Sequence, residues 1–380
     1  MNFFRNFFRR PQQLWIRRVN FQVHLWVGII LALYLIVIGV TGSILVLRVE
    51  LGALAGAQPL HSINASEPIA DISSVVRNLK AAYPRYRIIQ VLGPETEPTF
   101  VARLQGEKQI RVAIDPTTAK VLGEDSRGPA WLDTLEQLHV SLFMSRSGRI
   151  LNGVGAAFLL LMCITGLVNW WPGVRNWKRA LKVDFRRSWR RINFDLHSSV
   201  GFWTLALISF WAVSGIYFAW PDQIFRFVDR ISPIVTAKPP IVSVTPQSGA
   251  AEPDLDRMVE RASAIDPGTK FAGVIFPISK TAPLEILMRR GNGLSREYED
   301  TLYFDPYTGR HLSTWQYGVN KSLGDWFIWS QAPMHFGVYW GLGVKIAWAV
   351  IGLAIPALAV TGLLMYWNRT LRKKWKRLLL

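Results

Sequence analysis

Four long apolar runs set the limits on how this chain can fold. They cover residues 25–47, 150–171, 197–220 and 341–367. A helix needs about 20 mostly apolar residues to cross the hydrocarbon core of a bilayer, and each run reaches that length. We therefore predict an α-helical membrane protein built on a four-span bundle.

Basic residues gather in three segments beside these runs. Residues 1–20 hold five Arg, residues 172–193 hold eight Lys or Arg against one Asp, and residues 368–380 hold six Lys or Arg. Together they account for the whole formal net charge of +18. With four spans they share one side of the membrane, which the positive-inside rule makes the cytoplasm. The charge indicates topology rather than nucleic-acid binding, because no basic folded domain accompanies it.

The remaining sequence divides around the spans. The first run exceeds the roughly 7–15 apolar residues of a cleaved signal peptide, so we expect it to be retained as an anchor. The polar stretches 48–130 and 221–320 are each long enough for a small domain outside the cytoplasm. We expect residues 131–149 and 321–340 at the membrane interface. The cytoplasmic parts are the N-terminus 1–24, the loop 172–196 and the tail 368–380.

Each polar stretch has the pattern of one helix, three strands and a tight turn, which predicts two small α+β domains and an internal duplication. The helices are expected over residues 71–83 and 255–265. The strands are expected over 87–93, 99–104 and 109–114, and over 270–276, 284–289 and 300–304. Asp115-Pro116 and Asp305-Pro306 begin the turns, and the hydroxyl residues that follow can cap them.

Four histidines form two matched pairs near the ends of the spans. His24 and His197 lie 173 residues apart within a repeated Arg-Arg-x-Asn-Phe-x-x-His motif. His139 and His335 are each followed 26 residues later by Thr-Gly. Small residues recur in register with the four histidines: Gly28, Gly201, Thr41-Gly42, Ser214-Gly215, Thr165-Gly166 and Thr361-Gly362. Ionisable residues at membrane depth are costly and therefore indicate function.

Span direction sorts the histidines by depth. The first and third spans run outward, so His24 and His197 lie at the cytoplasmic end, while His139 and His335 lie at the outer end. Two imidazoles at one depth on two helices are what axial ligation of a haem in a bundle requires. We therefore predict two haem sites, with Gly28 and Gly201 leaving room for a porphyrin.

Further residues are candidates for holding these cofactors. Seventeen residues rise about 25 Å along a helix, which brings each Thr-Gly or Ser-Gly pair to the depth of the opposite site. We expect each haem to be gripped by these small residues. Four arginines could bind propionates at the cytoplasmic site: Arg17, Arg18, Arg190 and Arg191. Arg149 and Lys345 could do the same at the outer site. The alternative is that these cations are headgroup anchors.

A zinc or di-iron centre is the competing metal hypothesis. Glu136-x-x-His139 fits half of a ferritin-like motif, but His335 has no matching Glu. Cys163 is the only cysteine, which excludes disulfides, thiolate clusters and covalently attached c-type haem.

The motifs resemble those of a known family. His24-x-x-x-Gly28, the Thr-Gly pairs, His335-Phe-Gly337 running into Gly341-Leu342, and Thr361-Gly362-Leu363-Leu364 are similar to the PepSY-associated transmembrane helix family. The polar stretches resemble PepSY domains. This family includes bacterial inner-membrane ferric-siderophore reductases of the ferrioxamine-reductase (FoxB-like) type. The resemblance implies two b-type haems and reduction of siderophore-bound iron in the periplasm.

These features predict a multi-pass protein of the bacterial inner membrane, with both termini cytoplasmic, that passes electrons outward to a ferric siderophore. The donor is expected to be a membrane quinol or a separate protein, because the chain has no dinucleotide fingerprint. Residues 326–331 could form a wall of the acceptor site, or an aromatic belt. Two other functions remain open, which are a siderophore carrier and a haem-free membrane anchor for domains that regulate a partner enzyme.

Overall fold

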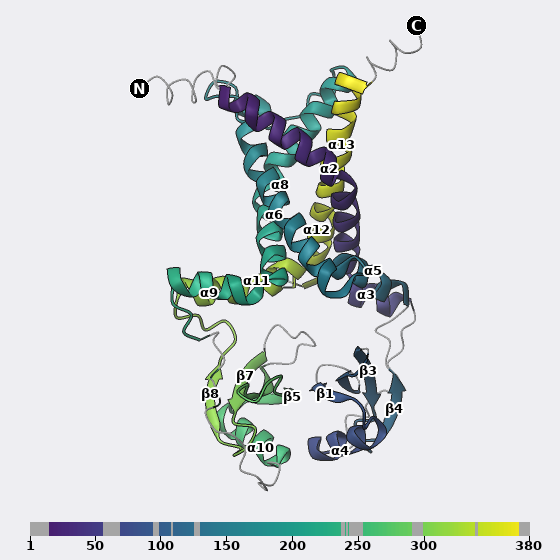
Figure 1. The fold of residues 1–380 in the computed structure, drawn as a ribbon, viewed down its shortest axis with the longest axis vertical. Coiled ribbons are helices and arrows are strands. Elements are labelled where there is room, and N and C mark those ends of the chain that lie inside the picture. Colours follow the sequence, from purple (N-terminus) through teal and green to yellow (C-terminus); the bar gives the residue numbers. More distant parts are fainter. Residues whose placement is uncertain are drawn as a thin grey trace. The chain divides into compact units, whose positions relative to one another are not determined.

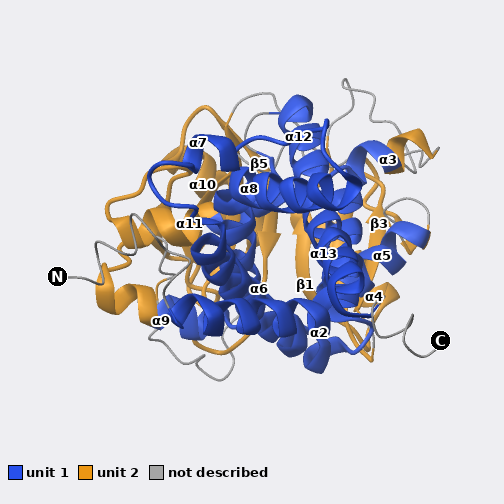
Figure 2. Ribbon diagram, turned by 90° about the horizontal axis from the view of Figure 1, so that it is seen from above, with its two compact units in different colours: residues 1–51, 131–226, 331–380 blue, residues 52–130, 227–330 orange. Residues whose placement is uncertain are grey.

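The computed structural model describes residues 15–55, 69–93, 99–107, 109–124, 130–236, 240, 242, 254–290, 299–338 and 341–371. The chain divides into two compact units, each assembled from segments far apart in the sequence (Figure 2). We call residues 1–51, 131–226 and 331–380 the bundle unit. Residues 52–130 and 227–330 form the sheet unit.

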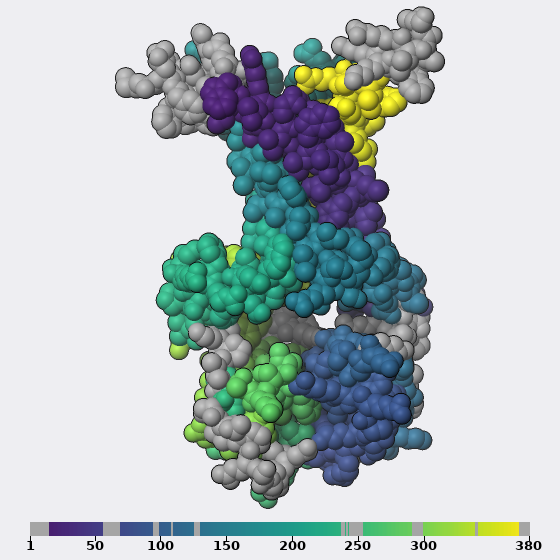
Figure 3. Space-filling model, viewed as in Figure 1, coloured from purple at the N-terminus to yellow at the C-terminus, as the bar shows by residue number. Residues whose placement is uncertain are grey.

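The bundle unit contains the four predicted spans (Figure 1). They are α2 (Trp15–Leu45), α6 (Ser145–Trp170), α8 (Trp189–Ala219) and a fourth, interrupted span, Gly341–Leu371. Each is long and apolar enough to cross a membrane. Large apolar side chains also point outward along α2, where Ile30 and Leu33 are 76% and 74% exposed. The purple atoms of α2 form part of the molecular surface seen in Figure 3. Such exposure suits contact with lipid tails, so the chain is a multi-pass membrane protein.

The fourth span is interrupted near its middle. It consists of α12 (Gly341–Gly352), α13 (Ala354–Tyr366) and the π-helix η3 (Trp367–Leu371). Pro356 has no N–H to donate to the carbonyl of Gly352, which explains the break. A Cβ at Gly39 would lie 2.5 Å from Pro356 Cδ, and one at Gly352 would lie 2.4 Å from Ser43 Oγ. Small residues therefore let α2 pack tightly against the interruption.

Shorter helices complete the part of the chain near the spans. They are α3 (Arg48–Leu54), α5 (Ala130–Ser141), α7 (Trp177–Ala180), α9 (Pro221–Ile231) and α11 (Leu323–Phe336). Of these, α5 and α11 lie in the stretches expected at the membrane interface, and they carry His139 and His335.

The sheet unit is one antiparallel sheet of eight strands, in the order β4-β3-β2-β1-β5-β6-β7-β8. Its first half is α4 (Ile72–Ala82), β1 (Arg87–Leu92), β2 (Phe100–Gln105), β3 (Gln109–Ile114) and β4 (Val121–Glu124). Its second half is α10 (Leu255–Ile265), β5 (Thr269–Ile275), β6 (Leu284–Arg290), β7 (Glu299–Phe304) and β8 (His311–Trp315). Apolar residues of α4, α10 and the sheet form one buried core.

Two expectations about the polar stretches were wrong. Each half has four strands rather than three, because a short edge strand, β4 or β8, follows the Asp-Pro turn. The halves are also not separate domains, since β1 pairs with β5 through Val91 and Val274. An unpaired β1 would expose a row of backbone donors and acceptors, and this pairing satisfies them. The turns form as predicted, with Asp115 and Asp305 accepting the backbone N–H groups that follow.

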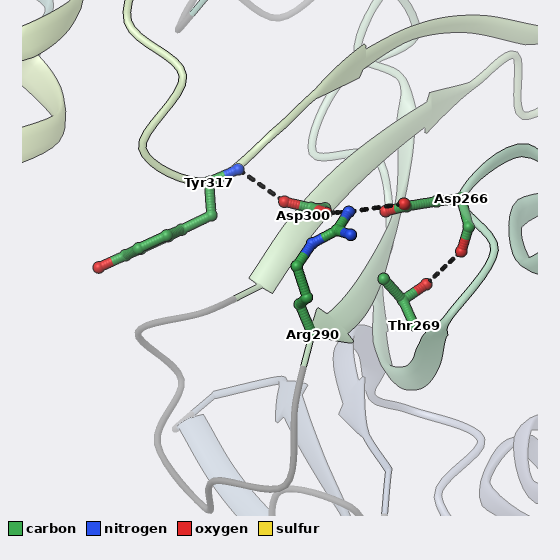
Figure 4. A network of polar contacts seen from close by, with 5 residues as sticks. All are labelled: Asp266, Thr269, Arg290, Asp300 and Tyr317. Carbon is green, nitrogen blue, oxygen red and sulfur yellow. Dashed lines mark hydrogen bonds and ion pairs between the residues drawn. The ribbon is translucent and has the colours of Figure 1, made fainter.

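A charged network supports the second half of the sheet (Figure 4). The Arg290 guanidinium lies 2.7 Å from Asp266 Oδ1 and 2.6 Å from Asp300 Oδ2. Asp300 Oδ1 accepts the backbone N–H of Tyr317 at 2.6 Å. Burial and the adjacent Asp300 carboxyl raise the pKa of Asp266, and Arg290 partly opposes this effect. The network ties the end of α10 to β6, β7 and the segment after β8.

Glu285 lies on the sheet face opposite the helices. Its neighbours Leu284 and Ile286 point into the core that α4 and α10 cover, so the side chain of Glu285 points the other way. Across the strands it faces Ile275 on β5 and Tyr303 on β7. Burial raises the pKa of Glu285 to about 6. Burial and the nearby Glu285 also raise the pKa of Tyr303.

This carboxyl should make the sheet unit less stable as the pH rises. The pKa of Glu285 is higher in the folded chain than its ordinary value of 4.5, so the folded state holds the extra proton between pH 4.5 and about 6. The free energy of unfolding therefore falls through this window, by about 2 kcal/mol at most. Glu285→Gln should flatten this part of the profile in thermal unfolding measured between pH 4.5 and 7.5. An identical pH profile for the variant and the unmodified chain would refute the assignment.

Candidate functional site: two histidine pairs in the bundle unit

The bundle unit brings the four predicted histidines together in the predicted pairs. The ring centroids of His24 and His197 are 6.3 Å apart, with the ring planes at 90°. Those of His139 and His335 are 6.5 Å apart, with an interplanar angle of 62°. We call these the first and the second histidine pair. Each ring comes from a different helix, namely α2, α8, α5 and α11.

Every imidazole contacts a hydroxyl on a neighbouring helix through Nδ1. The distances are 2.9 Å from His24 to Thr165 Oγ1, 3.0 Å from His197 to Thr361 Oγ1, 3.0 Å from His139 to Thr41 Oγ1 and 2.6 Å from His335 to Ser214 Oγ. These hydroxyl residues are the ones singled out by the sequence. Each of these hydroxyls contacts a histidine directly, so the hydroxyl residues position the rings as well as lining the site.

The direction of these hydrogen bonds follows from counting protons. Each hydroxyl has one proton, and in all four cases it is donated to a main-chain carbonyl three or four residues earlier on the same helix. We therefore assign the hydroxyl oxygen as the acceptor of this contact and Nδ1 as the nitrogen that carries the imidazole proton. Nε2 then has a free lone pair, which is the form of histidine that binds a metal.

The glycine after three of the hydroxyl residues makes room for the ring. A Cβ at Gly42 would lie 2.8 Å from Cε1 of His139. At Gly166 and Gly362 it would lie 3.3 Å from His24 Cε1 and 3.4 Å from His197 Cε1. Gly215 differs, because its Cβ would meet Ala156 Cβ at 3.0 Å. Glycine thus admits an imidazole at three sites and a helix contact at the fourth.

A cavity of about 1120 Å³ opens beside the first pair. The rings of His24 and His197 line it together with four glycines, Gly28, Gly166, Gly201 and Gly362. Its wall is otherwise mostly apolar, with basic and amide groups at one end. A cavity of this volume is large enough for an organic cofactor. Met162 reaches into the space beside Gly28, since its Cε lies 3.1 Å from a Cβ built there.

The second pair is more tightly enclosed. The ring of Phe218 meets His335 edge-on at 5.2 Å, and Phe336 stacks on Phe218 at 5.9 Å. Burial lowers the pKa of His139 to about 4. Burial, and then the adjacent His139, lower the pKa of His335 to about 3. Both rings are therefore neutral at physiological pH.

The basic residues predicted to bind propionates have different surroundings in the structure. Arg18 lines the cavity of the first pair, as expected. Arg191 instead pairs with Asp195 at 2.9 Å, and Lys345 pairs with Glu50 at 2.9 Å. Arg149 is exposed.

Sequence reasoning missed one other arginine. Arg369 also lines the cavity, with its guanidinium 5.2 Å from the ring of Phe21. Nothing in the sequence marks the π-helix that carries Arg369. Arg369 could therefore not be distinguished from the other basic residues of the C-terminal tail. Arg17, a candidate from the sequence, lines the cavity too, and it donates to the carbonyls of Asn169 and Trp171 at the end of α6.

Glu136, the carboxylate that the zinc or di-iron hypothesis would use as a ligand, forms an ion pair instead. Glu136 lies 3.1 Å from the Arg48 guanidinium, which also contacts Asp133. Within the described residues, no cluster of three or more His, Cys, Asp or Glu side chains is placed to hold a metal ion.

Removing one ring-holding hydroxyl should cost stability. Thr165→Val keeps the shape of the side chain but leaves the N–H of a buried imidazole without an acceptor, which costs about 1–3 kcal/mol. We expect a lower melting temperature in detergent, and recovery with Thr165→Ser. Thr204→Val is the matched control, because Thr204 Oγ1 donates to Val200 O at 2.7 Å and no imidazole contact to it is recorded among the described residues. Equal losses for Thr165→Val and Thr204→Val would contradict the role given to the ring contact.

Comparison with known proteins agrees with this architecture. The chain is 27% identical over 266 residues to the uncharacterized protein PA4219 of Pseudomonas aeruginosa, covering 63% of this chain and 64% of that relative. The chain thus spans somewhat less than two thirds of the length of this relative. The family described as the PepSY-associated TM region matches residues 21–369, which include all four histidines and most of each of the four spans. The chain therefore belongs to the PepSY-associated TM region family.

Proposed function

We propose that the two histidine pairs hold two b-type haems and that the protein moves electrons across the bacterial inner membrane. The observation that carries this proposal is the spacing of the rings. A metal–imidazole bond of about 2 Å and a ring radius of about 1.1 Å put the centroids of two trans imidazoles about 6 Å apart. The two pairs stand at 6.3 and 6.5 Å, and among the described residues no hydrogen bond to Nε2 of any of the four rings is recorded.

The surroundings of the rings fit such a group. The glycines around the first pair leave a cavity where side chains would otherwise stand, and a flat macrocycle needs such a space. Arg18 and Arg369, at the edge of this cavity, have the charge to bind propionates. The hydroxyl contacts hold each imidazole in the tautomer that ligation needs. Haem at these positions would supply reversible one-electron transfer.

The direction of transfer rests on the charge of the chain. The three basic segments favour cytoplasmic termini, and with four spans the sheet unit would then lie in the periplasm. Electrons would then enter at the first pair and leave at the second. We propose a membrane quinol or a separate protein as the donor and a ferric siderophore as the acceptor. One electron converts the chelated Fe³⁺ to Fe²⁺, which oxygen ligands bind less tightly and release, and no group transfer is needed.

The carrier alternative draws on the interruption of the fourth span, since carriers bind substrate at broken helices. Here Gly39 and Ser43 of α2 pack against the break, next to Pro356 and Gly352. Close backbone packing at the break suits a rigid helix crossing better than a substrate cavity. The regulator alternative leaves the four matched histidine–hydroxyl contacts without a purpose. Electron transfer accounts for both features.

The cofactors can be tested by absorbance. Purified full-length protein, expressed with ample haem, should show a sharp Soret band and about two haems b per chain. His24→Ala and His139→Ala should each remove one haem, and the double variant should be colourless. His311→Ala is the control, because His311 contacts Thr314 in the sheet unit and should change nothing. A correctly folded protein that contains no haem would refute the proposal.

The acceptor can be tested in stopped-flow experiments. Protein reduced with limiting dithionite should be reoxidised by a ferric siderophore, and a ferrous trap such as ferrozine should recover the iron. The same siderophore loaded with Ga³⁺ is the control, because this ion matches Fe³⁺ in charge and coordination but does not accept an electron. Reoxidation that is equally fast with gallium, or absent with every ferric siderophore tried, would exclude iron reduction and leave the haem assignment intact.

A further inference from the structure

We propose that Asn20 and Asn193 are positioning residues that fix the orientation of the first pair of imidazoles. The inference rests on the proposed function, because ring orientation matters to an electron-transfer site only when a haem lies between the rings. Both asparagines belong to the repeated Arg-Arg-x-Asn-Phe-x-x-His motif, four residues before His24 and His197. The haem proposal itself makes no use of them.

Each asparagine contacts the same neighbouring residue as its histidine. Asn20 Nδ2 donates to the carbonyl of Thr165 at 2.8 Å, and Thr165 Oγ1 accepts from His24. Asn193 Nδ2 donates to the carbonyl of Thr361 at 3.0 Å, and Thr361 Oγ1 accepts from His197. The two helix pairs, α2 with α6 and α8 with α13, use the same arrangement.

Two contacts one turn apart restrict more motion than one. Residues i and i+4 lie on the same helix face, so an asparagine and the histidine one turn later can contact the same threonine. The asparagine contacts its carbonyl and the histidine contacts its hydroxyl. The hydroxyl contact alone sets the tautomer but lets the neighbouring helix slide or rotate. With the carbonyl also held, the hydroxyl is fixed relative to the histidine backbone, and so is the plane of the ring.

The burial of the asparagines supports a specific role. Asn193 is only 1% exposed, and its Oδ1 is buried without a hydrogen-bond partner in the described part of the chain. Burying an amide in an apolar bundle costs free energy, and an unused acceptor adds to that cost. A leucine would fill similar space without this penalty. Asn20 has a second contact of its own, to Asn169 Oδ1 at 2.9 Å.

The second pair provides an internal comparison. Leu135 stands four residues before His139, and its side chain has no donor. His139 is held instead at its own carbonyl, which accepts from Asn152 Nδ2 at 2.6 Å. The second histidine of this pair, His335, has the buried Gln331 four residues before it, so asparagine occupies this position only in the first pair. The rings stand at 90° in the first pair and at 62° in the second. Changes at Asn20 and Asn193 should affect one haem and spare the other.

Electron paramagnetic resonance of the oxidised full-length protein tests this inference, because the largest g value of low-spin ferric haem depends on the angle between its axial imidazoles. We expect Asn20→Leu and Asn193→Leu to shift the signal of the first haem, to leave that of the second unchanged, and to weaken retention of the first haem about 10-fold. Asn193→Gln, which keeps a donor, should restore part of the signal. Asn78→Leu is the matched control, because Asn78 Nδ2 donates to Ala119 O at 2.8 Å within the sheet unit.

The possible results distinguish a failure of the asparagine role from a failure of the proposed electron-transfer function. Loss of only the first haem in the leucine variants would support the positioning role as strongly as a shifted signal. Both haem signals unchanged in both leucine variants would overturn the inference and leave the electron-transfer proposal standing. If the leucine variants do not fold, Asn20→Ala and Asn193→Ala, which also remove the donor, take their place, and unchanged signals in both decide against it in the same way. Unmodified protein without haem would instead defeat the proposed function.

Discussion

The hydrogen bond from an imidazole Nδ1 to a hydroxyl on the neighbouring helix is the interaction on which the bundle depends. It solves two problems at once. A polar ring inside an apolar bundle needs a partner for its N–H, and the hydroxyl provides one. The hydroxyl has already donated its proton within its own helix, so it can only accept from the ring. The ring is left with one nitrogen that can bind a metal, and the opposite ring of its pair lies 6.3 or 6.5 Å away between centroids.

Small residues make this interaction possible at each helix crossing. Gly42, Gly166 and Gly362 each follow a hydroxyl residue and leave the space that an imidazole edge fills. Without hydrophobic attraction between helices in lipid, close packing and polar contacts are what hold spans together. The same short sequence, a hydroxyl residue followed by glycine, thus serves both purposes. Its repetition in four spans explains why the two histidine pairs resemble each other so closely.

The sequence predicted the pairing of the histidines but not the way they are held. Span direction was enough to place His24 with His197 and His139 with His335, because depth in a membrane follows from topology. The roles of Thr165 and Asn20 were out of reach, since they depend on which helix faces which, and helical phase within one span does not decide that. The prediction of the sheet was incomplete for a similar reason. Local alternation marked three strands in each half, while the pairing of β1 with β5 joins strands far apart in the chain.

That pairing also has a consequence for how the chain is made. β1 ends at Leu92 and β5 begins at Thr269, so ribosomal synthesis of the intervening residues takes about 10–35 s at typical rates. For that time the first half of the sheet has an open edge of backbone donors and acceptors, which can pair with other chains. The nascent protein would therefore benefit from a chaperone on the side where this segment emerges. Only after the third span has been inserted can the chain close its own sheet.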